Sequence, residues 1–86
     1  MIVPTKGVAP QRALLAVGAQ VVLATERQPV TISQAWRRLL AWRESNNHHS
    51  PLTFSWFALS LDLLYAMGLV ELEQDVLIFR ARDDAA

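Results

Sequence analysis

The sequence predicts a small, mainly helical domain that ends in a β-hairpin. Apolar residues recur with helical spacing in three segments between residues 11 and 67, and after Gly68 the period of the apolar residues changes to two. Eighty-six residues can build one core of a few packed elements. The order of helix, short extended piece, two helices and hairpin is typical of a winged helix-turn-helix. We therefore expect an N-terminal arm over residues 1–10, one winged-helix-like domain over residues 11–82 and a disordered tail over residues 83–86.

Two prolines and a glycine mark the N-terminal arm. Pro4, Gly7 and Pro10 disfavour a helix before residue 11. The first helix should begin near Gln11 and end at Thr25. The small residues that should let another element approach this helix closely are Ala13, Ala16, Gly18 and Ala19.

A capping motif marks the start of the second helix. Thr31 followed three residues later by Gln34 has the Thr-x-x-Gln form of a capping box, which predicts a helix from Ile32 to about Glu44. The side chains expected to face inward are Ile32, Trp36, Leu39 and Leu40. Those expected to face outward are Gln34, Arg37, Arg38 and Glu44. Residues 45–51 are polar or turn-forming and predict a loop.

The third helix and the hairpin have clear boundary signals. Thr53 is a suitable N-cap for a helix that reaches Met67, and Gly68 stands where a left-handed residue usually ends a helix. A two-residue turn at Gln74 and Asp75 would then form the hairpin. That turn pairs Leu72 with Leu77 and Val70 with Phe79, which places these four residues on one face of the hairpin.

The third helix carries more apolar residues than a chain of this length can cover. Of the 16 residues from 53 to 68, 11 are apolar, and Asp62 is the one charged residue among them. We expect the core to take Phe57, Leu61 and Leu64, with Phe54 as a further candidate. We expect three residues to point away and to need cover from another chain, namely Trp56, Leu59 and Leu63. Asp62 would lie either on a solvated strip or against an arginine of a partner.

The charge balance argues against a dedicated nucleic-acid binder. Eight basic and eight acidic residues give no net charge, and the third helix has no Arg, Lys, Asn or Gln to read DNA bases. The one basic cluster, Arg37, Arg38 and Arg43, is either a solvated helix face or a contact for an acidic partner or for phosphates. The alternative function is a winged-helix DNA-binding regulator or antitoxin, in which phosphates would be contacted by Arg37, Arg38, Arg80 and Arg82.

No pattern for catalysis, metal binding or membrane insertion is visible. The chain has no cysteine, its three glycines are isolated, and the adjacent His48 and His49 lie in the polar loop, where two neighbouring rings do not easily reach one ion. The charge-free run over residues 13–25 is too short to span a bilayer. We expect a cytoplasmic protein that is not an enzyme and that binds no cofactor.

A set of motifs is spread over residues 3–73, namely Pro4-Thr5-Lys6, Pro10, Arg12-Ala13-Leu14-Leu15, Trp36, Thr53-Phe54, Trp56-Phe57 and the segment 59–68. With these motifs the chain resembles the small middle component of bacterial ABC-three-component systems. The resemblance implies a non-catalytic adaptor between an SMC/Rad50-like ABC ATPase and an effector, a nuclease or protease, in Lamassu-like defence against phage or plasmids.

The surplus of apolar residues on the third helix and the family resemblance both indicate a subunit of a larger complex. The residues expected to bind partners are Pro4, Thr5, Lys6, Trp56, Leu59, Asp62 and Leu63. The arm is included because an extended segment with apolar residues can add to a neighbour's surface. In isolation the chain should aggregate or form a homodimer, and Trp56→Ala should lose the complex at a cost of about 2 kcal/mol or more.

Overall fold

The computed structural model describes residues 10–80, which form three helices and a three-stranded antiparallel sheet. The elements are α1 (Pro10–Thr25), β1 (Val30–Thr31), α2 (Ile32–Ser45), α3 (Phe54–Ala66), β2 (Val70–Glu73) and β3 (Val76–Phe79). Helices account for most of the described residues, as the sequence predicts. The predicted arm up to residue 9, with the candidate partner residues Pro4, Thr5 and Lys6, and the predicted tail lie outside the described residues.

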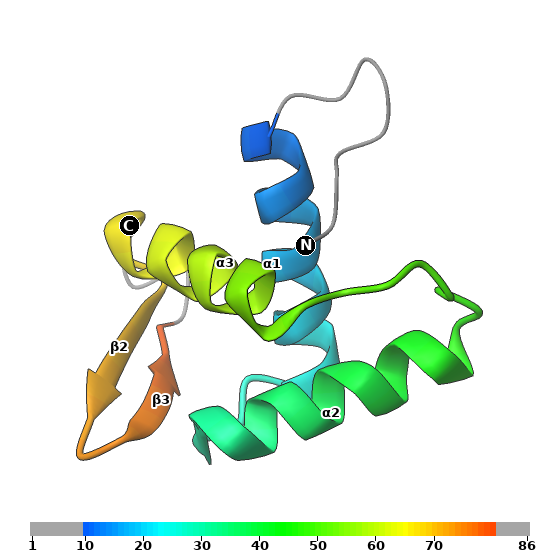
Figure 1. Cartoon of the computed structure of the whole chain (residues 1–86). Helices are drawn as coiled ribbons and strands as arrows, with labels where there is room; N and C mark the ends of the chain where they lie inside the picture. Colours follow the sequence, from blue (N-terminus) through cyan, green and yellow to red (C-terminus); the bar gives the residue numbers. More distant parts are fainter. Residues whose placement is uncertain (1–9, 81–86) are drawn as a thin grey trace.

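Helix α1 is the element on which the other two helices pack. Figure 1 shows α1 upright, with α3 and α2 both crossing it. Helix α3 comes close to α1 at Gly18, where an added Cβ atom would lie 3.0 Å from Cδ2 of Leu64. The prediction of a close contact along α1 is therefore confirmed at Gly18, whereas Ala16 and Ala19 are exposed.

The capping box predicted for α2 is present. The Gln34 backbone N–H donates to Oγ1 of Thr31 at 3.1 Å, and the Thr31 N–H donates to Oε1 of Gln34 at 2.9 Å. Leu39 is fully buried as expected, but the prediction that Leu40 faces inward is wrong, because its side chain is 42% exposed. The buried stripe of α2 instead repeats every four residues, at Ala35, Leu39 and Arg43.

Both ends of α3 follow the sequence signals. The Trp56 N–H donates to Oγ1 of Thr53 at 3.2 Å, as expected for an N-cap. At the other end Gly68 has a φ of +76°, and the Leu69 N–H donates to the carbonyl of Leu64 at 2.9 Å. This is a Schellman motif, which glycine favours because it reaches a positive φ without strain.

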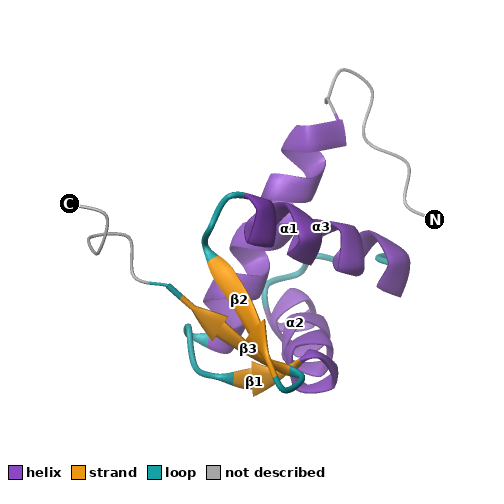
Figure 2. Ribbon diagram, turned by 90° about the vertical axis from the view of Figure 1, so that its left-hand side faces the viewer, coloured by secondary structure: helices purple, strands orange, loops and turns teal. Residues whose placement is uncertain are grey.

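The hairpin has the predicted register, and a third strand joins it. Leu72 lies opposite Leu77, and the turn residues Gln74 and Asp75 both have positive φ, as in a type I′ turn. The strand order is β1-β3-β2, with Val30 opposite Leu77, and Figure 2 shows the three strands side by side. The sequence predicts an extended piece at β1 but not its pairing with β3.

The core joins the three helices to the inner face of the sheet. Its buried apolar residues are Val17, Val21, Val30, Ala35, Leu39, Trp56, Phe57, Leu61, Leu64, Val70 and Leu77. Thr25 and Ser60 are also fully buried, and their hydroxyls donate to backbone carbonyls of their own helices. Within residues 10–80, no helix is both long and apolar enough to cross a membrane.

Candidate protein-interaction site

The outward side of α3 presents apolar side chains on both flanks of one carboxylate. Tyr65 is 64% exposed and Phe54 50% exposed on one flank, and Leu59 is 45% exposed on the other. At 100° of rotation per residue, Asp62 lies between these flanks, and it is exposed. We call Phe54, Ala58, Leu59, Asp62 and Tyr65 the α3 surface.

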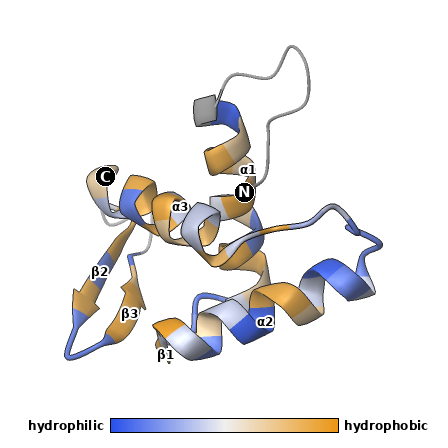
Figure 3. Cartoon of the chain, in the orientation of Figure 1, coloured by the Kyte–Doolittle hydropathy of each residue, from blue (hydrophilic) through white to orange (hydrophobic). Residues whose placement is uncertain are grey.

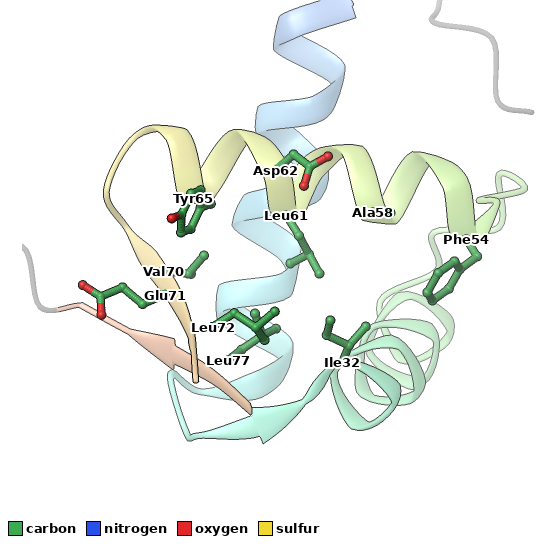
Figure 4. Close-up of a pocket in the computed structure, with 10 residues that line it drawn as sticks. All are labelled: Ile32, Phe54, Ala58, Leu61, Asp62, Tyr65, Val70, Glu71, Leu72 and Leu77. Atoms are coloured by element: carbon green, nitrogen blue, oxygen red, sulfur yellow. The ribbon is translucent and has the colours of Figure 1, made fainter. Parts of the chain in front are cut away.

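A groove of about 420 Å³ runs below the Phe54 and Tyr65 side of α3. Figure 4 shows Tyr65 and Leu61 projecting from α3 toward the strands, with the Asp62 carboxylate on the helix side away from them. The groove is bounded by α3, the sheet and the start of α2. Its lining residues are Ile32, Phe54, Ala58, Leu61, Asp62, Tyr65, Val70, Glu71, Leu72 and Leu77.

The charges at the groove are acidic, and one of them is paired. Glu71 forms an ion pair with Arg80 across the hairpin. It is the single ion pair between described residues, so Asp62 has no cationic partner within residues 10–80. The groove therefore offers an apolar lining with one unmatched carboxylate at its rim.

The residues of α3 predicted to bind partners differ in their exposure in the structure. Trp56 is only 6% exposed, so the prediction that it points away from the core is wrong. It lies on the same stripe as Ser60 and Leu64, the stripe that meets α1 at Gly18. Leu59 is exposed and Leu63 is half-buried.

Phe54, Tyr65 and Leu72 are the exposed groove residues that the sequence interpretation did not assign to partners. Phe54 is half out of the core, and its ring packs edge-to-face on Trp36 with 5.4 Å between centroids. Residues 54, 58 and 65 lie along one edge of the helix face that carries the expected core residues Phe57 and Leu61, and this spacing could have identified the flank.

Arg43 is not part of an exposed basic cluster, and that prediction is wrong. Its residue is 7% exposed; Nη1 donates to Oε1 of Gln20 at 2.8 Å and Nη2 to the carbonyl of Ser50 at 2.7 Å. Burial lowers the pKa of Arg43 below its ordinary value, because desolvation disfavours the charged form. The guanidinium joins α1, α2 and the loop before α3.

The other two arginines of the predicted cluster are exposed on α2. Arg38 donates from Nη1 to Oε1 of Gln28 at 2.9 Å, and Arg37 is open to solvent. On the same helix, Trp42 stacks on His48, with ring centroids 5.3 Å apart. Among residues 10–80, no group of three or more His, Cys, Asp or Glu side chains could hold a metal ion.

A second apolar surface lies on the side of α1 that faces away from α2 and α3. Leu23 is 59% exposed and Leu15 41% exposed. Arg12, Ala16 and Ala19 are exposed on the same stripe, at helical spacings of three and four. We call these five residues the α1 surface. Figure 3 shows apolar residues along much of α1 and α3, whereas α2 alternates between polar and apolar residues.

Comparison with known protein families agrees with the resemblance found in the sequence. The model of the family described as ABC-three component (ABC-3C) system Middle Component 6 matches residues 3–80. The chain belongs to this family. As the middle component of a system with several components, it has protein partners by implication. No curated protein and no solved structure matches the chain.

Proposed function

We propose that this middle component is a non-catalytic adaptor in a cytoplasmic bacterial defence complex. It joins an SMC/Rad50-like ABC ATPase to an effector, a nuclease or a protease, that acts against phage or plasmids. Membership of the ABC-3C family supports a place among several components. Which components the chain touches is part of the proposal.

The observation that carries the proposal is a pair of separate apolar surfaces. Gly18 of α1 faces Leu64 of α3, so the outer sides of the two helices point away from each other. The α1 surface and the α3 surface occupy these outer sides. Exposed apolar surface is costly in water and commonly marks a protein interface. An adaptor needs one such surface for each partner.

The arrangement of the sheet supports a winged helix as the fold that presents these surfaces. The three helices precede a hairpin, and β1 closes the sheet beside β3. In a winged-helix DNA reader, the helix before the hairpin needs Arg, Lys, Asn or Gln on its outer side. Here that helix is α3, which carries none of these residue types. A protein partner suits its apolar outer side better than a DNA groove.

Separate disruption of the two surfaces tests the adaptor role. The chain is co-expressed with the ATPase and the effector of its own system, and the complexes are purified through a tag on the chain. We expect Leu23→Asp on α1 to lose one partner and Leu59→Asp on α3 to lose the other. Leu40→Asp on α2 is the matched control, since Leu40 is equally apolar, is 42% exposed and lies outside both surfaces.

Two outcomes would contradict the adaptor role. One is loss of the same single partner in both variants, and the other is an equal loss in Leu40→Asp. The chain expressed alone is expected to aggregate or to form a homodimer, because its apolar surfaces then have no other cover. A stable, soluble monomer would count against the proposal.

DNA binding is the second candidate, and exposed Arg37 and Arg38 favour it. Both lie on α2, where they could contact phosphates. Arg80 is already paired with Glu71, which weakens its case. A salt-sensitive shift of promoter DNA by the wild-type chain, abolished in Arg37→Glu, would support a regulator. The adaptor role predicts no such shift.

A further inference from the structure

The position of Asp62 restricts what can cover the α3 surface. Its carboxylate is the one charge on α3 and lies between the Phe54 and Tyr65 flank and the Leu59 flank. A partner that buries both flanks must also cover the residue between them. Covering Asp62 removes its water.

A carboxylate that loses its water needs hydrogen-bond donors in place of the water, and a cation is the strongest such donor. Burying an unpaired charge costs several kcal/mol, whereas a charge-assisted hydrogen bond to Arg or Lys offsets much of that cost. No described residue supplies the cation, because the single ion pair between described residues joins Arg80 to Glu71. The covering chain must therefore bring it.

We propose that the α3 surface binds a partner segment whose side chains are apolar apart from one arginine or lysine that pairs with Asp62. Its apolar side chains enter the groove between α3 and the sheet, beside Leu72 and Tyr65. The inference rests on the proposed function and assigns the chemistry of one of its two contacts. The cation fixes the register of the segment along α3, since the remaining contacts are apolar and lack direction.

Two segments of this chain also combine apolar side chains with a cation, so the experiment must distinguish them from a segment of a partner. Residues 1–9 contain several apolar residues and Lys6. The α1 surface of a second copy combines Arg12 with Leu15 and Leu23. A foreign partner agrees best with the family, whose members belong to systems of several components.

Charge variants at Asp62 form the first part of the test. The Kd of Asp62→Asn and of Asp62→Arg for the separately purified ATPase and effector is measured with the chain diluted below the concentration at which it self-associates. For the partner on the α3 surface, we expect about thirty-fold weaker binding or more with Asp62→Arg, and a smaller loss with Asp62→Asn. Glu44→Arg and Glu44→Gln are matched controls, because Glu44 is exposed on α2 outside both surfaces, and they should change Kd less than about twofold.

Cross-linking identifies the covering segment. A photo-reactive amino acid at Ala58, inside the groove, should cross-link to a peptide of the ATPase or the effector that contains Arg or Lys. Changing the basic residue of that partner peptide to Glu should restore its binding to the Asp62→Arg variant. Cross-links to residues 1–9, or to a second copy of the chain, would overturn the proposal, as would unchanged binding by Asp62→Arg.

The result also separates this inference from the adaptor role. If Asp62→Arg binds normally while Leu23→Asp and Leu59→Asp still release different partners, Asp62 does not pair with a cation of the partner, and the adaptor role is still supported. A second result would separate them the other way: Asp62→Arg loses its partner, a partner with Glu in place of its Arg or Lys restores binding, and no three-component complex forms. The pairing of Asp62 with a cation is then correct, and the adaptor role is wrong.

Discussion

Two charged side chains, Arg43 and Asp62, differ in whether the fold buries them. Arg43 is buried, and its guanidinium donates to Gln20 and to the carbonyl of Ser50. Asp62 is exposed and has no cation among the described residues. Asp62 is the one charged residue of an apolar helix, whereas Arg43 stands beside Glu44 in a helix of mixed polarity. The sequence alone therefore gives no sign that Arg43 is the buried one.

The difference shows which surface the chain covers by itself. Around Arg43, three parts of the chain meet and supply the acceptors that a buried guanidinium requires. Around Asp62, the apolar side chains stay open and no donor is provided. Changes at the first position should therefore act on stability, and changes at the second should act on binding.

The largest stability effect is expected from a matched pair of phenylalanines on α3. Phe57 is fully buried, and Phe57→Ala should lower the free energy of unfolding by about 3–5 kcal/mol, because it leaves a cavity in the core. Phe54→Ala should cost less than half as much, since Phe54 is 50% exposed. Urea unfolding of the two variants measures the difference. Equal losses would mean that the outer flank of α3 is part of the core.

Removal of the Arg43 side chain should have the next largest effect. Arg43→Ala leaves the Ser50 carbonyl and the Gln20 amide without their donor, which should cost about 2–3 kcal/mol. Arg37→Ala, on the exposed side of the same helix, should stay within about 0.5 kcal/mol of wild type. Thermal unfolding followed by circular dichroism gives both values. Similar stability of the two variants would show that the Arg43 contacts contribute nothing.

Loss of a helix cap should lower the free energy of unfolding by a smaller amount. Thr31→Ala and Thr53→Ala each remove the hydroxyl that accepts an N–H at the start of a helix, so each should cost about 1 kcal/mol. For a domain of this size, that lowers Tm by about 4–8 °C. Ser33→Ala, inside α2 and exposed, is the calorimetric control. A control as unstable as the cap variants would contradict the assignment.

Asp62 should have the smallest effect on stability. Asp62→Asn should change the free energy of unfolding by less than about 0.5 kcal/mol, because the carboxylate is exposed and pairs with no described cation. The measurement is urea unfolding beside Arg43→Ala. A loss near that of Arg43→Ala would mean that Asp62 belongs to the fold and not to an interface.

Local signals in the sequence predict the ends of the elements well. Thr31 with Gln34, Thr53, and Gly68 depend only on residues a few positions away, and the structure confirms each of them. The hairpin register follows in the same way from the turn at Gln74 and Asp75. These features are local, so they do not require knowledge of the packed fold.

Contacts between distant segments could not be predicted in this way. Val30 pairs with Leu77 across 46 intervening residues, and Arg43 is buried because Gln20 and Ser50 reach it from other elements. Trp56 is buried on the stripe of α3 that also carries Leu64, and Leu64 meets α1 at Gly18. The apolar pattern of α3 alone does not show which of its stripes meets α1. The sequence of an apolar helix shows that much of its surface must be buried. It does not show which side is buried by the same chain and which side by a partner.

Side-chain footprinting of Tyr65 tests the central claim most directly. Hydroxyl-radical labelling of Tyr65, 64% exposed, is compared between the isolated chain, diluted below the concentration at which it self-associates, and its complex with the ATPase and the effector, with Trp56, 6% exposed, as the internal control. We predict strong labelling of Tyr65 in the isolated chain, strong protection in the complex, and weak labelling of Trp56 in both. Equal labelling of Tyr65 in the two states would contradict the claim that a partner covers the outer side of α3.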